Sequence, residues 1–85
     1  MKTIEVFVES HCRSCLNVIR MIRSIALEGD PEVRILYRST FPLEFVKRGV
    51  VITPATFMNG RLVFYGEFSE EALLQYLNHH QSNNH

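Results

Sequence analysis

Both cysteines of this 85-residue chain lie in one four-residue stretch, from Cys12 to Cys15. The run from Thr3 to Val8, in which apolar residues alternate, precedes this stretch and predicts a β-strand. The run from Leu16 to Leu27, in which apolar residues recur at steps of three and four, predicts an amphipathic helix that opens on the cysteine pair. A strand, a short turn and a helix in this order favour an α/β fold.

This position gives the first thiol a place that favours ionisation. Unpaired N–H groups and the helix dipole stabilise a thiolate at a helix N-terminus. The three-residue step puts Cys15 about one turn after Cys12, so the two sulfurs can form a disulfide. We interpret the pair as a dithiol/disulfide exchange site. The alternatives are a metal or iron–sulfur site using the same thiolates, and a structural disulfide, which would close too small a loop to stabilise much.

The rest of the chain predicts two more helices and three more strands. Because the second strand follows the first through a helix, the two are expected to pair in parallel with a right-handed crossover. Asn59-Gly60 between two apolar runs predicts a β-hairpin, whose aromatic residues we expect to pack rather than to bind a cofactor. The predicted elements are a strand at Val33–Arg38, a helix at Phe41–Arg48 ended by Gly49, hairpin strands at Ala55–Met58 and Arg61–Tyr65, and a helix capped by Ser69.

Length and charge bound the organisation and the partners of the chain. Eighty-five residues allow one small core, so we expect one domain over residues 1–78 and a frayed polar tail over 79–85. Nine basic and nine acidic residues cancel without forming runs, which argues against nucleic acid and membrane surfaces as partners. Glu5 and Glu9 interrupt the one stretch that could serve as a signal peptide, so a cytoplasmic location is expected.

Three motifs in sequence order resemble the thioredoxin superfamily in its minimal, glutaredoxin-sized form. The first is the cysteine pair after the first strand. The segment Lys47 to Phe57 is similar to the one that leads thioredoxins into their cis-proline, and Met58 to Gly66 is similar to their hairpin and following glycine. The likeness extends from about Thr3 to Leu77 and is closest to small redox-active disulfide proteins. It implies a β-α-β-α-β-β-α minimal thioredoxin fold, in which a four-stranded mixed sheet carries the first and third helices on one face and the second on the other.

The resemblance also implies an activity, that of a thiol–disulfide oxidoreductase in electron transport and cell redox homeostasis. In this activity Cys12 is the nucleophile that attacks a protein disulfide, and Cys15 resolves the mixed disulfide. The family further implies a cis Thr53–Pro54 bond and substrate contacts by Thr53 and Pro54, whereas an ordinary trans turn proline is the alternative. We expect no bound cofactor, a monomer, and re-reduction by a reductase or a low-molecular-weight thiol.

Several positions depart from the family pattern. His11 stands where thioredoxins usually have Trp, and Arg13-Ser14 replaces Gly-Pro, so the redox potential is not carried over. We expect Arg13 to lower the pKa of the Cys12 thiol modestly, while His11 is either a second tuning group or a solvated loop histidine. Val6 occupies the place of a buried Asp of many thioredoxins. Proton removal from the second cysteine then falls to solvent, His11 or Glu9.

Overall fold

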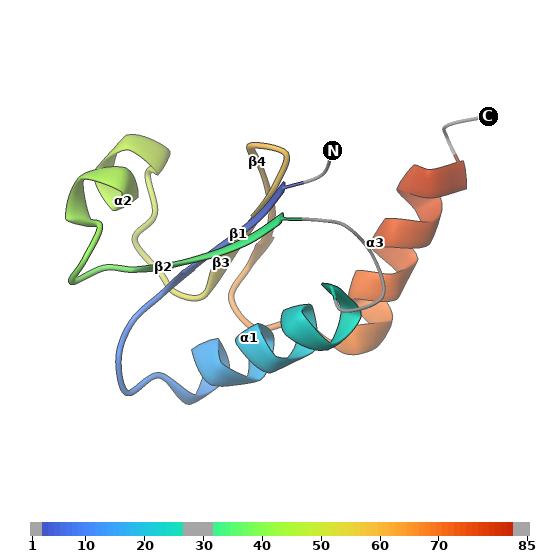
Figure 1. Cartoon of the computed structure of the whole chain (residues 1–85), viewed down its shortest axis with the longest axis horizontal. Coiled ribbons are helices and arrows are strands. Elements are labelled where there is room, and N and C mark those ends of the chain that lie inside the picture. Colours follow the sequence, from blue (N-terminus) through green and yellow to red (C-terminus); the bar gives the residue numbers. More distant parts are fainter. Residues whose placement is uncertain (1–2, 27–31, 83–85) are drawn as a thin grey trace.

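The computed structural model describes residues 3–26 and 32–82 (Figure 1). The predicted order of four strands and three helices is confirmed, and Leu27, the last residue of the run that predicts the first helix, lies outside the described residues. The elements are β1 (Thr3–Val8), α1 (Arg13–Ala26), β2 (Glu32–Tyr37), α2 (Pro42–Arg48), β3 (Ala55–Met58), β4 (Arg61–Tyr65) and α3 (Glu70–Ser82).

The four strands form one mixed sheet in the order β2-β1-β3-β4. β1 pairs in parallel with β2, from Thr3 opposite Glu32 to Val8 opposite Tyr37, as expected for strands joined through a helix. β1 pairs antiparallel with β3, and β3 pairs antiparallel with β4. β1 and β3 are therefore the central strands, which explains why all four residues of β3 are buried.

The two faces of the sheet carry different helices, as the resemblance implies. Successive side chains of β1 point to opposite faces, so Ile4, Val6 and Val8 belong to one core cluster and Phe7 to the other. The first cluster also includes residues of α1 and Leu73 of α3, and the second includes Phe45 of α2. Figure 1 shows α1 below the strands, α3 to their right and α2 at their upper left.

Local sequence signals set the turns around the site. Gly49 ends α2 in the left-handed conformation, with φ of 69°. Asn59 and Gly60 both have positive φ, 53° and 84°, as the predicted hairpin turn requires. The Ser69 hydroxyl accepts a hydrogen bond of 3.0 Å from the Ala72 N–H and so caps α3.

The last helix is longer than the sequence suggests. Residues 79–82, expected in a frayed tail, continue α3 as far as Ser82, while 83–85 lie outside the described residues. Each residue added to an existing helix gains a backbone hydrogen bond, so a polar end can propagate without burying a face. Across the part of the chain that the structure describes, each helix falls short of the length and apolar character needed to cross a bilayer.

Candidate active site

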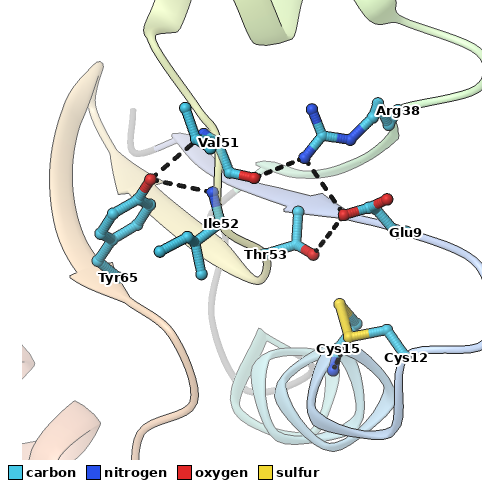
Figure 2. Close-up of polar contacts among 8 residues, drawn as sticks. All are labelled: Glu9, Cys12, Cys15, Arg38, Val51, Ile52, Thr53 and Tyr65. Atoms are coloured by element: carbon cyan, nitrogen blue, oxygen red, sulfur yellow. Dashed lines mark hydrogen bonds and ion pairs between the residues drawn. A yellow bond between two sulfur atoms is a disulfide. The ribbon is translucent and has the colours of Figure 1, made fainter.

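The cysteine pair lies at the N-terminus of α1. The Cys12 carbonyl accepts the first helical hydrogen bond, 3.1 Å from the Leu16 N–H, so Cys12 is the N-cap residue. Its Sγ accepts a second bond of 3.1 Å from the backbone N–H of Cys15. The two Cα atoms are 5.2 Å apart and the sulfurs are joined as a disulfide, as Figure 2 shows.

The two sulfurs differ in depth. Cys15 is 1% exposed and belongs to the core cluster between the sheet and α1, whereas Cys12 is partly buried and packs against that cluster from outside. A thiol at the position of Cys12 can be reached by another molecule, and one at the position of Cys15 is covered by the protein. The geometry therefore distinguishes an outer and an inner sulfur.

His11 and Arg13 flank the outer sulfur but face solvent. His11 has a positive φ of 59° in the turn before α1, and Arg13 is the first residue of the helix. Both are exposed, and within residues 3–26 and 32–82 neither side chain has a hydrogen bond or ion pair. Their influence on the thiol pKa stays a prediction.

The loop before β3 lies at the same end of the sheet as the cysteine pair. Phe7 of β1 is opposite Ala55 of β3, so the residues after Phe7, which lead to Cys12, run alongside those before Ala55. The Thr53–Pro54 peptide bond is cis, Pro54 is fully buried and Thr53 is partly exposed. Figure 2 shows Thr53 on the side of the loop that faces the disulfide.

Glu9 and Arg38 bind this loop, a role that sequence reasoning does not reveal. Glu9 Oε2 accepts hydrogen bonds from Arg38 Nη2 at 3.2 Å and from Thr53 Oγ1 at 3.0 Å. The same Arg38 nitrogen donates to the Val51 carbonyl at 2.8 Å. The Arg38 guanidinium, and after it the Thr53 hydroxyl, hold the pKa of the Glu9 carboxyl below its usual value. Whether Glu9 takes the proton of Cys15 stays a prediction.

Tyr65, the last residue of β4, binds the loop from the other side. Its hydroxyl oxygen accepts hydrogen bonds from the N–H groups of Val51 at 3.2 Å and Ile52 at 3.0 Å (Figure 2). The expectation that Tyr65 serves in packing is thus wrong for its polar end, and about half of the residue is exposed. Because these contacts join residues 13 and 14 positions apart, no local pattern in the sequence predicts them.

Among the open hollows on the described part of the surface, one adjoins the site and another lies away from it. The smaller, of about 490 Å³, adjoins the site, since Glu9, Ser10, Arg38, Ser39 and Pro42 line it. The larger, of about 570 Å³, lies between β4 and α3 and shares no residue with the cysteine pair or its loop. In residues 3–26 and 32–82, no three His, Cys, Asp or Glu side chains are grouped as metal ligands.

Comparison with known proteins agrees with this geometry. A thioredoxin mutant from Halobacterium salinarum NRC-1 has a similar structure, with a TM-score of 0.76 and 19% sequence identity over 88% of this chain and 70% of that one. No curated protein matches the chain. A family model described as "Thioredoxin domain" matches residues 2–78, which is most of the sequence. The chain therefore belongs to the thioredoxin domain family.

Proposed function

We propose that this protein is a thiol–disulfide oxidoreductase that reduces protein disulfides with Cys12 and Cys15. Membership of the family and a cysteine pair at disulfide distance support a redox role. The observation that carries the finer proposal is the hydrogen bond from the Cys15 N–H to the Cys12 sulfur at the start of α1. A donor aimed at the sulfur and the positive end of the helix dipole both stabilise a thiolate, which is the reactive form of cysteine.

The reaction has two exchange steps. The Cys12 thiolate attacks one sulfur of the substrate disulfide, forms a mixed disulfide and releases the other substrate sulfur as a thiolate, which takes a proton from water. Cys15 then loses its proton and attacks the Cys12 sulfur, which forms the Cys12–Cys15 disulfide and releases the second substrate thiol. The substrate gains two electrons and two protons, and the cysteine pair is oxidised by the same amount. Cys15 is suited to the second step because it is buried beside Cys12 and shielded from other disulfides.

The loop supports docking of an extended substrate. In the described part of the chain, the N–H and C=O of Thr53 make no hydrogen bond, whereas the Pro54 carbonyl accepts one of 2.7 Å from the Gly66 N–H. Unpaired backbone groups at the margin of a sheet can pair with an added peptide strand. We infer that Thr53 and Pro54 contact the segment that carries the substrate disulfide.

Return to the dithiol state requires an electron donor. We propose a reductase dithiol or low-molecular-weight thiols, which would attack the disulfide at the more exposed Cys12 sulfur, supply two electrons by the same exchange chemistry and leave as a disulfide. The cytoplasmic location and the monomeric state stay predictions.

The test compares the two cysteine variants on a protein disulfide such as that of insulin. Cys12→Ser should abolish reduction because it removes the nucleophile, whereas Cys15→Ser should accumulate a mixed disulfide through Cys12, visible by mass spectrometry without reductant. Equal behaviour of the two variants would contradict the assigned roles. Stoichiometric zinc or iron in protein purified under reductant without chelator would instead favour a metal carrier that uses the same thiolates.

A further inference from the structure

The segment from Val51 to Thr53 has little packing to hold it in place. Val51 is 73% exposed and Ile52 is 58% exposed, although both are large apolar residues. A loop with few buried contacts opens locally at low cost unless hydrogen bonds fix it. Between its buried neighbours Val50 and Pro54, the segment is therefore held mainly by polar contacts.

These contacts come from three strand ends. Glu9 follows β1, Arg38 follows β2 and Tyr65 ends β4, and together we call these three residues the loop clamp. Arg38 is itself placed by backbone pairing, because its N–H donates to the Val8 carbonyl at 3.0 Å. Its guanidinium also lies over the Phe45 ring, 4.6 Å from the centroid. The clamp is thus anchored in the sheet and in α2 rather than in the loop that it holds.

The loop clamp forms hydrogen bonds with the segment from both sides. Arg38 donates a hydrogen bond to the Val51 carbonyl, and Glu9 accepts one from the Thr53 hydroxyl. The Tyr65 hydroxyl accepts hydrogen bonds from the N–H groups of Val51 and Ile52. No residue of the clamp makes a hydrogen bond to either cysteine sulfur within the described residues. What this arrangement fixes is the placement of the Thr53 backbone relative to the sulfurs.

We propose that Glu9, Arg38 and Tyr65 are positioning residues that hold Thr53 ready to pair with an extended substrate, and so set the affinity for protein disulfides. This role rests on the proposed function. A substrate that pairs with a fixed backbone does not have to order the loop on binding, so loss of the clamp weakens docking. The chemistry of Cys12 is left intact because its activating donor is the backbone N–H of Cys15.

Tyr65→Phe is the sharpest test, because it deletes the accepting oxygen and keeps the ring. Two lost hydrogen bonds should raise KM for an extended peptide disulfide by about 10-fold and leave kcat within about 2-fold. Reduction of bis(2-hydroxyethyl) disulfide, which is too small to pair with Thr53, should be unchanged. Hydrogen exchange should show faster exchange of the Val51 and Ile52 amides in the variant.

Tyr37→Phe is the matched control, since Tyr37 also ends a strand at the surface and its hydroxyl has no hydrogen-bond partner among the described residues. It should leave KM and amide exchange unchanged.

Arg38→Met, which keeps the aliphatic stem, should reproduce the effect of Tyr65→Phe. If the wild type is active and Tyr65→Phe changes KM by less than about 2-fold, the proposed role of the loop clamp is wrong and the proposed function stands. The same conclusion follows if Tyr65→Phe loses as much activity on the small disulfide as on the peptide. A wild type that reduces neither substrate overturns the proposed function and the clamp with it.

Discussion

Two glutamates, four residues apart at β1 and just beyond it, bind arginine in different surroundings. Glu5 is on the α2 face with its side chain 5% exposed, and both oxygens are used, at 2.8 and 3.0 Å by Arg48 and at 3.0 Å by Arg34. Glu9 is at the cysteine end of the sheet with its side chain 43% exposed, and among the described residues only its Oε2 accepts hydrogen bonds, from Arg38 and Thr53.

We infer that the ion pairs of Glu5 stabilise the fold, whereas the ion pair of Glu9 positions the loop at the candidate site. Removing one partner of a buried ion pair leaves the other charge buried, without a partner and without water. An exposed ion pair is screened by solvent and contributes little to stability. Arg48 also lies over the rings of Phe7 and Phe57, at 5.6 and 5.2 Å from their centroids, so Glu5 ties α2 to the aromatic core. The hydrogen bond to Glu5 raises the pKa of the Arg48 guanidinium above its usual value.

The largest effect is expected at the buried glutamate. Glu5→Gln should lower the free energy of unfolding by about 2 kcal/mol, less than for a fully buried pair because both arginines reach solvent. Urea denaturation measures this, with Glu32→Gln as the control, since Glu32 is exposed on the neighbouring strand and has no ion-pair partner within the described residues. If Glu5→Gln and Glu32→Gln lowered the free energy of unfolding equally, burial of the Glu5 ion pairs would not contribute to stability.

The two arginines that meet Glu5 should differ in the strength of their coupling to it. In double-mutant cycles with Glu5→Gln, Arg48→Met should give a coupling of about 1–2 kcal/mol, because Arg48 makes two bonds and its side chain is 28% exposed. Arg34 makes one bond and its side chain is 49% exposed, so screening should keep its coupling below about 1 kcal/mol. A stronger coupling to Arg34 would contradict this ranking.

The smallest change in stability is expected at Glu9. Glu9→Gln should leave the urea midpoint at neutral pH close to that of the wild type, since the pair is exposed. The pKa of Glu9 in the folded protein is below its usual value of 4.5. The charge-assisted hydrogen bond from Thr53 is therefore fully formed above pH 4.5, and it is lost as the pH falls through the lowered pKa. NMR of the Thr53 methyl group should show a transition below pH 4.5 in the wild type and none in the variant. A transition that persists in Glu9→Gln would assign it to another group.

The sequence predicts what depends on neighbours along the chain. The bounds of β1, the Asn59-Gly60 turn and the cap at Ser69 all follow from residues within a few positions of each other. The cysteine pair is found for the same reason, since its chemistry follows from its three-residue spacing and its place before a helix.

The sequence does not predict contacts between side chains that are distant along the chain. Glu9 meets residues 29 and 44 positions away, and Arg48 meets Glu5 43 positions away. Glu5 alternates with apolar residues in β1, a pattern that is typical of a side chain in water, yet it is buried because α2 covers that face. The helical extent of α3 was missed for another reason, since a polar composition does not stop a helix that has already formed.

The donor to the Cys12 sulfur, the backbone N–H of Cys15, belongs to the main chain, and this affects how the protein can be altered. Every residue except proline supplies an N–H at position 15, so mutation of side chains around the pair leaves this donor in place. Positions 13 and 14 are then open to randomisation: a library varying their charge and bulk should sample a range of reduction potentials while the backbone donor to the proposed nucleophile, Cys12, is kept.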